Sequence, residues 1–343
     1  MSGYVMPAEG SPQDRVWMAF PSAGYSLGDT ESARHEARST WAAVAHAVAQ
    51  FEPVTMLVDP AELDFANRYV SQDIEIVEAP LNDAWMRDIG PTFVHAADGS
   101  VAAVDWTFNG WGAQDWARWD RDEKIGATVA GLAGVPVIES GLVNEGGGIQ
   151  VDGQGTVLVT ETVQLDPGRN PGITKADVEA ELARTIGATD VVWLPRGLTR
   201  DSQRFGTRGH VDIVAAVTAP GRLLLHTQTA EAHPDHLVCK EIRTVLDGSF
   251  EIVEMPAPAT LTDDEGYVDY SYINHLVVNG GVIACAFDDP RDADAAAILA
   301  EQYPGRAVVT VDARPLFERG GGIHCITQQQ PSPITPRSLH ARA

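Results

Sequence analysis

The residues best suited to covalent chemistry gather in a glycine-rich turn near the end of the chain. Cys325 follows the glycine run 320–322 and His324, and polar Thr327 and Gln328 come soon after it. Glycines permit unusual backbone conformations and close ligand approach. A free cysteine is most often an inert buried hydrophobe. This setting is a poor one for the end of a core strand, however, so the sequence predicts a reactive cysteine at position 325.

His210 and Asp212 form a second candidate pair. In a strand, residues two apart point to the same face, so this spacing predicts a histidine and a carboxylate at one site. A purely structural hydrogen bond between them would explain the spacing equally well. Asp88 lies between Arg87 and the turn-forming residues 90–91. It is a third candidate, although many such acids only cap turns.

His233, His236 and Cys239 have the spacing H-x2-H-x2-C, which raises the question of a metal site. Three residues at i, i+3 and i+6 spread around a helix too widely for one compact ligand face, and the second cysteine pair of a structural zinc site is missing. The sequence also lacks a phosphate-binding loop and a G-x-S-x-G nucleophile elbow. We therefore expect no metal and no cofactor.

The elements that must position these residues follow a repeating order. Amphipathic periodicity predicts helices over five segments: 29–51, 117–134, 174–187, 234–247 and 290–303. Each is followed by a short apolar run rich in β-branched residues, which predicts a strand. After each strand come a Gly- or Asp-rich turn and another apolar run. Five such units without a linker predict one catalytic α/β domain over residues 1–343 with approximate fivefold symmetry, and flexible arms at 1–14 and 331–343.

Charge and cysteine content limit the partners and the compartment. The formal charge of −24 argues against nucleic acid or an anionic membrane and favours a small cation, unless the charge serves solubility alone. The three cysteines are odd in number and widely spaced, which suits reduced thiols and a cytoplasmic protein. Cys239 and Cys285 lie in helix-like and strand-like surroundings and are expected to be inert. The start of the chain lacks a signal-peptide pattern, and no apolar stretch approaches the ~20 residues of a membrane span.

Several separated motifs, from about residue 4 to 331, resemble those of the agmatine deiminases, which belong to the guanidine-modifying superfamily. They are W-x-R-D-x-G-P at 85–91, N-x-W-G at 109–112, E-G-G at 145–147, N-P at 170–171, W-L-P-R-G at 193–197, G-H-x-D at 209–212 and I-H-C-I-T-Q-Q-Q at 323–330. The resemblance implies a five-bladed α/β propeller of ββαβ units with pseudo-fivefold symmetry around a central substrate pocket. It leaves open whether the chain forms a homo-oligomer.

Carried over residue by residue, the resemblance assigns roles to the candidates. It makes Cys325 the nucleophile, His210 the general acid and base, and Asp88 and Asp212 the carboxylates that grip a guanidinium. The substrate-binding set that it implies comprises Trp85, Asp88, Trp111, Glu145, Arg208 and Asp212. The implied substrate is a small cationic guanidino compound, most simply agmatine, which would be hydrolysed to N-carbamoylputrescine and ammonia through a cysteine thiouronium intermediate.

Some positions depart from the family pattern and leave the substrate open. Gly206 stands where an acidic residue usually meets the distal amine of the substrate, and Arg208 replaces a usual asparagine. Gly148, Gln150 and Gly322 also differ from the customary Ser, His and Asn. An Arg208 side chain that points into the pocket would favour a guanidino acid, whereas one that points to solvent would leave Asp263, Asp264 or Glu265 to bind the amine.

These departures leave the proposed chemistry intact, and two alternatives to hydrolysis remain open. An enzyme of this family could transfer the amidino group to an amine in place of water. A protein that binds a guanidino compound without turning it over is a further hypothesis, although the joint presence of Cys325, His210, Asp88 and Asp212 argues against it.

Overall fold

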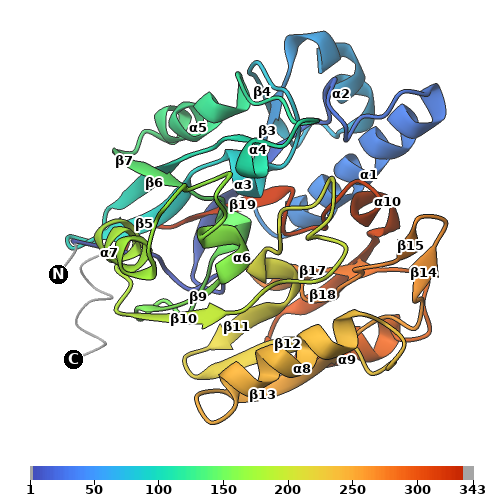
Figure 1. Ribbon diagram of the computed structural model, residues 1–343. Helices are drawn as coiled ribbons and strands as arrows, with labels where there is room; N and C mark the ends of the chain where they lie inside the picture. Colours follow the sequence, from blue (N-terminus) through green and yellow to red (C-terminus); the bar gives the residue numbers. More distant parts are fainter. Residues whose placement is uncertain (1–2, 335–343) are drawn as a thin grey trace.

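The computed structural model describes residues 3–334. Within this range the strands form five sheets of three or four strands and one two-stranded hairpin. Each of the five sheets contains the same unit, in which two strands pair antiparallel and a helix then leads to a third strand parallel to the second (Figure 1). The predicted α/β class and the helix–strand alternation are confirmed.

The elements of the units have the following bounds. The first four units comprise β5 (Thr92–Ala96), β6 (Val101–Thr107), α5 (Ile125–Ala133) and β7 (Val137–Val143); β8 (Gln150–Val151), β9 (Thr156–Thr160), α7 (Lys175–Ile186) and β10 (Asp190–Leu194); β11 (Ala215–Ala219), β12 (Arg222–Thr227), α8 (Asp235–Leu246) and β13 (Glu251–Pro256); and β16 (Leu276–Val278), β17 (Gly281–Ala286), α9 (Asp292–Gln302) and β18 (Ala307–Asp312). The fifth comprises β19 (Thr327–Pro331), β2 (Gln13–Ala19), α1 (Glu31–Ala49) and β3 (Val54–Val58), extended by β4 (Glu75–Glu78).

Shorter elements complete the described chain. They are β1 (Tyr4–Val5), the hairpin of β14 (Thr262–Asp263) and β15 (Gly266–Tyr267), helices α2 (Leu63–Tyr69), α3 (Met86–Ile89), α4 (Gly110–Ala113), α6 (Glu161–Gln164) and α10 (Arg314–Phe317), and the 3-10 helices η1 (Pro60–Glu62), η2 (Asp122–Lys124), η3 (Gly146–Gly148) and η4 (Val211–Ile213). Several of these short helices lie in the loops where the sequence places its chemistry.

Local sequence signals explain where α7 begins and ends. The Thr174 side chain accepts a hydrogen bond from the Asp177 backbone, and the Asp177 carboxylate accepts one from the Thr174 backbone, which is the reciprocal capping box predicted there. Gly187 ends the helix in the left-handed conformation, with φ of 75°. Val178, Leu182 and Ile186 are buried on one face, as their spacing predicts.

Helix α5 begins later than predicted, at Ile125 in place of 117. Asp122 explains the difference, because its buried carboxylate accepts hydrogen bonds from the backbone of Asn82 and Asp83 at 2.7 and 3.1 Å. These bonds tie the chain before α5 to a distant loop. Trp116, in that preceding segment, stacks on Trp111 with ring centroids 5.4 Å apart. Tertiary contacts therefore override the helical periodicity of this stretch.

The described part of the predicted N-terminal arm, residues 3–14, is packed on the domain. Tyr4–Val5 pairs antiparallel with β5, and Met6 donates a backbone hydrogen bond to Ile186. Glu9 reaches the side chain of His324 at 2.7 Å. At the other end, Pro331 still belongs to β19, and residues 335–343 of the predicted tail lie outside the described residues.

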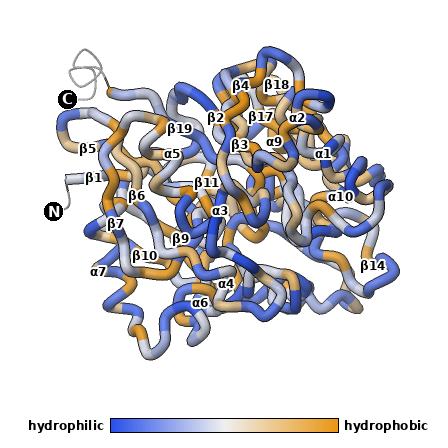
Figure 2. The backbone as a smooth tube through the Cα atoms, turned by 90° about the horizontal axis from the view of Figure 1, so that it is seen from above, coloured by the Kyte–Doolittle hydropathy of each residue, from blue (hydrophilic) through white to orange (hydrophobic). Residues whose placement is uncertain are grey.

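Hydrophobic residues concentrate in the strands, as along β5, β6 and β17 (Figure 2), and the helices also bury apolar residues. Trp17 on β2 and Trp41 on α1 are among the largest fully buried side chains, so this sheet and its helix share one core. Hydrophilic segments lie at the periphery, for example at the β14 hairpin (Figure 2). No helix among residues 3–334 combines the length and apolar character needed to cross a membrane.

Candidate active site

Three loops, each between two successive units, meet at Gly147 in η3. A Cβ atom on Gly147 would lie 2.5 Å from His210 Nδ1 and 3.0 Å from both Asp212 Oδ2 and Asp88 Oδ1. Such contacts are too close for any side chain, so glycine is required where these groups approach the backbone. The structure thus brings together three of the four residues to which the sequence assigned chemistry. Cys325 Sγ, the fourth, lies 3.6 Å from Asp212 Oδ2.

Cys325 is 5% exposed and lies in the turn that precedes β19. Its Sγ atom accepts a hydrogen bond from the Asn274 side-chain amide at 3.2 Å. Burial raises the pKa of the thiol well above its usual value, and the nearby carboxylates of Asp212 and Asp88 raise it further. These shifts favour the neutral thiol, and a cation beside the sulfur would favour the thiolate.

The glycine run before Cys325 has a steric reason. A Cβ atom on Gly321 would lie 2.7 Å from the ring of Trp85 and 3.1 Å from Cys325 Sγ. At Gly322 it would lie 2.4 Å from Asn274 Oδ1. The family's customary asparagine at position 322 is absent here, and the neighbouring space is filled by Asn274, a residue that no sequence motif singled out.

His210 does not lie in a strand, contrary to the geometry predicted from the His-x-Asp spacing. It precedes η4, and Asp212 lies within this short helix. His210 Nε2 contacts Glu145 Oε2 at 3.1 Å, whereas Nδ1 is buried and has no hydrogen-bond partner within residues 3–334. Burial would lower the pKa of His210, but the carboxylates of Asp88, Glu145 and Asp212 outweigh it and raise the pKa to about 9. The imidazole is therefore protonated at neutral pH, with Nδ1 available to the site.

The two aspartates are held in different ways. Asp88 Oδ2 accepts a hydrogen bond from Trp111 Nε1 at 2.8 Å, and Oδ1 accepts one from the Gly147 backbone at 3.2 Å. Burial raises the pKa of Asp88 to about 6, although His210 opposes the shift. Asp212 Oδ2 contacts His324 Nδ1 at 2.8 Å, while its buried Oδ1 has no partner in the described chain. Burial would raise the pKa of Asp212, but His324 and other cations outweigh it and lower the pKa.

Glu145 lies behind His210. Its carboxylate forms an ion pair with Arg169 at 3.0 Å, and both side chains are fully buried. Arg169 also donates to the Thr207 carbonyl at 2.7 Å, which fixes the loop that carries His210. Burial would raise the pKa of Glu145, but Arg169 and His210 lower it below its usual value. Glu145, predicted to bind substrate, therefore contacts His210 and Arg169 in the empty site, and the sequence had given no sign of Arg169.

A small aromatic pocket leads to Cys325, which lines it. Its wall includes the predicted Trp85 and Trp111, and also Trp116 and Phe205, which belong to no motif. The Phe205 ring stacks on Tyr25 with centroids 4.3 Å apart and an interplanar angle of 5°. These rings line the approach to Cys325 with apolar faces, which suits a planar cation.

The remaining candidates do not line this cavity. Arg208 is half-buried with φ of 76°, and it is not among the residues that line the cavity. Cys239 and Cys285 are buried, and burial raises their thiol pKa values to about 11 and 12.

The residues of the H-x2-H-x2-C spacing bind backbone groups. His233 Nε2 contacts the Val268 carbonyl at 3.1 Å, His236 Nδ1 contacts the Gln228 carbonyl at 2.9 Å, and Cys239 Sγ accepts a hydrogen bond from the Gln228 amide. Each of the three is thus accounted for by a backbone partner.

Comparisons with known proteins identify the family of this chain. Residues 5–331 match the model of the Porphyromonas-type peptidyl-arginine deiminase family. A Streptomyces coelicolor relative, provisionally named an agmatine deiminase, is 53% identical over 95% of this chain and 98% of its own. The agmatine deiminase of Pseudomonas putida is 39% identical over 97% of this chain and 96% of its own. The solved structure of Enterococcus faecalis agmatine deiminase has a TM-score of 0.89 at 31% identity and 97% coverage of both chains. The chain therefore belongs to the Porphyromonas-type peptidyl-arginine deiminases and, within them, to the agmatine deiminase family.

Proposed function

We propose that this enzyme hydrolyses agmatine to N-carbamoylputrescine and ammonia, with Cys325 as the nucleophile. One observation carries the proposal: two buried polar atoms without hydrogen-bond partners in the described chain, His210 Nδ1 and Asp212 Oδ1, belong to side chains that surround Gly147 beside Cys325 Sγ. The nearest charge to His210 Nδ1 is the Asp88 carboxylate, at 3.9 Å. Unpaired buried polar atoms are costly, so they indicate where a ligand makes its hydrogen bonds. The relatives named as agmatine deiminases supply the specific substrate.

Binding the guanidinium also prepares the nucleophile. Asp88 and Asp212 accept its N–H groups, which fixes the planar carbon above the sulfur. The substrate's positive charge offsets the two carboxylates that raise the thiol pKa, so Cys325 loses its proton to solvent as the cation binds. The thiol of Cys325 thereby stays protonated and unreactive until the substrate binds, and binding forms the thiolate.

The reaction then proceeds in two halves. The thiolate attacks the guanidinium carbon to give a neutral tetrahedral intermediate, and protonated His210 donates its Nδ1 proton to one nitrogen. The C–N bond breaks, ammonia leaves, and a thiouronium cation remains on Cys325. Neutral His210 next takes a proton from water as the water oxygen attacks the same carbon. The C–S bond breaks to release the ureido product and the thiolate, and the remaining hydroxyl proton passes to solvent.

The distal amine of the substrate needs a partner other than position 206. Asp263 and Glu265, two of the acids predicted for this role, both pair with Arg200, at 2.5 and 2.9 Å. A second cavity shares Phe205, Gly206 and Gly320 with the catalytic cavity, and Asp269 lines it.

Asp269 is 8% exposed, and Arg200, which pairs with Asp263 and Glu265, lines the same cavity and lowers the pKa of the Asp269 carboxyl in part. Burial raises the pKa of this carboxyl to about 7. We therefore assign the ammonium to Asp269. The same assignment leaves Arg208 at the periphery and disfavours a guanidino acid as substrate.

The fold belongs to the same proposal. We infer that the five units form a single catalytic domain, arranged as a five-bladed α/β propeller whose pseudo-fivefold axis passes near Gly147. Support comes from the origin of the catalytic loops, which belong to different units yet converge at that residue. A site built in this way needs every unit in place, so we expect unfolding to be cooperative and to abolish activity in one transition.

One experiment separates hydrolysis from amidino transfer and from binding alone. The purified protein is incubated with agmatine and with a guanidino acid of similar length, and both ammonia and ureido product are measured. Equal amounts of the two products without an added amine support hydrolysis. Product that requires an acceptor amine indicates amidino transfer, and tight binding without turnover indicates a binding protein.

A further inference from the structure

A buried chain of three ionisable side chains leads away from the catalytic centre. His324 Nδ1 contacts Asp212 Oδ2 at 2.8 Å, and His324 Nε2 contacts Glu9 Oε1 at 2.7 Å. The His324 and Asp212 side chains are 2% and 1% exposed, and that of Glu9 is 11% exposed. Both ring nitrogens of His324 thus face carboxylates, an arrangement that favours the doubly protonated, cationic ring.

The charges that surround His324 support the same state. Burial and the nearby guanidinium of Arg87 would lower the pKa of His324, but Glu9 and Asp212 outweigh them and raise it. His275 also lies close by, and burial lowers its pKa to about 4, so that ring adds no charge at neutral pH. The chain therefore alternates in sign: carboxylate at Asp212, imidazolium at His324 and carboxylate at Glu9.

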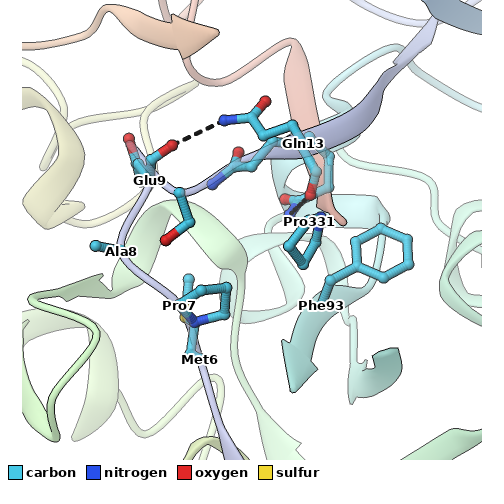
Figure 3. Close-up of a pocket in the computed structure, with 10 residues that line it drawn as sticks. Met6, Pro7, Ala8, Glu9, Gln13, Phe93 and Pro331 are labelled. Carbon is cyan, nitrogen blue, oxygen red and sulfur yellow. Dashed lines mark hydrogen bonds between the residues drawn. The ribbon is translucent and has the colours of Figure 1, made fainter. Parts of the chain in front are cut away.

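The N-terminal segment that supplies Glu9 is firmly held. Gln13 Nε2 donates to the Glu9 carbonyl at 2.8 Å and to the Val277 carbonyl at 2.9 Å. Gln150 Nε2 donates to Glu9 Oε1 at 3.1 Å. Gln150, which departs from the customary histidine of the family, therefore contacts the Asp212–His324–Glu9 arrangement. Figure 3 shows Glu9 and Gln13 at a small cavity with Phe93, where the N-terminal segment closes over the end of β19.

We propose that Glu9 and His324 are positioning residues that keep Asp212 ionised and oriented to bind the guanidinium. Because the proposal concerns that carboxylate, it rests on the proposed function. The N-terminal segment thereby becomes part of the active site, although it lies 315 residues from His324 in the sequence. The reacting atoms contact Asp212 alone, and Glu9 and His324 act through it.

The test compares Glu9→Gln and His324→Asn with the parent. In His324→Asn the amide nitrogen takes the place of Nδ1, which keeps the hydrogen bond to Asp212 and removes the charge. We expect KM for agmatine to rise about tenfold or more in His324→Asn, with a smaller change in kcat. Glu9→Gln keeps the histidine, so a smaller rise of the same kind is expected. Glu62→Gln is the control, because Glu62 pairs with Arg38 at a buried site outside this chain.

The pH profile of kcat/KM distinguishes positioning from a merely structural role. In the parent, kcat/KM rises with pH as Asp88, whose pKa is about 6, and the Cys325 thiol, whose pKa is raised, lose their protons. Without the His324 cation the pKa of Asp212 rises, so a second carboxylate must also lose its proton. The acid limb of His324→Asn should therefore move to higher pH and become steeper. A fall in melting temperature with an unmoved limb, as expected for Glu62→Gln, would overturn the proposal.

A readout independent of turnover keeps this test separate from the proposed function. Histidine ring NMR of the unliganded protein follows the His324 titration, which is assigned by the signal that His324→Asn lacks. The proposal predicts a His324 pKa above 6.5 in the parent and a lower one in Glu9→Gln. If His324 titrates at the same pH in Glu9→Gln and in the parent, the proposed Asp212–His324–Glu9 arrangement is wrong, even where the enzyme is active. Absence of turnover with a normal titration contradicts only the proposed substrate.

Discussion

His210 Nε2 lies 3.1 Å from Glu145 Oε2, and this contact leaves Nδ1 as the nitrogen that faces the catalytic centre. The orientation of the ring follows from the pair, because Glu145 is itself fixed by Arg169. A general acid needs both the right protonation state and the right direction. In the proposed mechanism, the Arg169–Glu145–His210 arrangement supplies both.

Replacing Glu145 with Gln should weaken the acid without removing it. Glu145 helps raise the pKa of His210 to about 9, so the variant should lose its protonated histidine at lower pH. Activity that depends on the imidazolium falls as pH rises through that pKa. The basic limb of the kcat profile should therefore move to lower pH. We expect kcat to fall on the order of 10- to 100-fold. Glu161→Gln, which removes a half-exposed pair with Lys175, is the control and should leave the limb in place.

Replacing Cys325 with Ala or Ser should reduce turnover by at least about 10³-fold, because the nucleophile is lost. Cys239→Ala and Cys285→Ala should keep most activity, since neither sulfur lies in the catalytic centre. Cys285 donates to the Asn274 carbonyl at 3.0 Å, so its variant should be less stable but active. Ammonia release, measured alongside melting temperature, checks this, and normal turnover by Cys325→Ala would contradict the mechanism.

The Asn274 amide donates to Cys325 Sγ, and its side-chain oxygen accepts from the His324 backbone at 3.0 Å. Asn274→Ala should lower kcat by removing the donor that favours the thiolate. Asn274→Asp should lower it further, because a third carboxylate near the sulfur raises the thiol pKa. Alkylation of Cys325 at several pH values measures that pKa directly. Equal alkylation profiles for the two variants would rule out an electrostatic role.

Asp269→Asn tests the assignment of the distal amine. Loss of a charged partner should cost about 1.5–3 kcal/mol of binding, a rise in KM for agmatine of about 10- to 100-fold. Burial raises the pKa of Asp269 to about 7, so its ionised form destabilises the empty protein at neutral pH, and the variant should melt no lower than the parent. Arg208→Asn is the matched comparison and should leave KM unchanged. If Arg208→Asn instead shifts the preference away from a guanidino acid, position 208 controls specificity.

Much of the fold could be predicted because each unit carries its own signals. The Thr174 capping box, Gly187 and the apolar stripe of α7 are local features that later packing did not change. The stretch before α5 shows the opposite case, since Asp122 binds backbone groups of a loop 40 residues away. Periodicity cannot report such a contact.

The candidate site divides in the same way. Cys325, His210, Asp88 and Asp212 could be found from residue type, spacing and the family motifs. Glu9 and Asn274 could not, because each lies in a segment without a chemical pattern and acquires its role only through the fold. His324 was within reach, as it adjoins the nucleophile in the I-H-C motif. No motif singles out Arg169, and only the structure shows that it is buried beside Glu145.

The pairing of β19 with β2 has a consequence for synthesis. Gln330 and Trp17 are 313 residues apart, yet they share a hydrogen bond at 2.9 Å across these two strands. During translation, the edge of β2 that pairs with β19 stays unpaired until almost the whole described chain has left the ribosome. Because Cys325 lies just before β19, the ribosome synthesises the proposed nucleophile and the strand that pairs with β2 at almost the same time. A nascent chain that stops before Thr327 should be inactive and prone to aggregate through that edge.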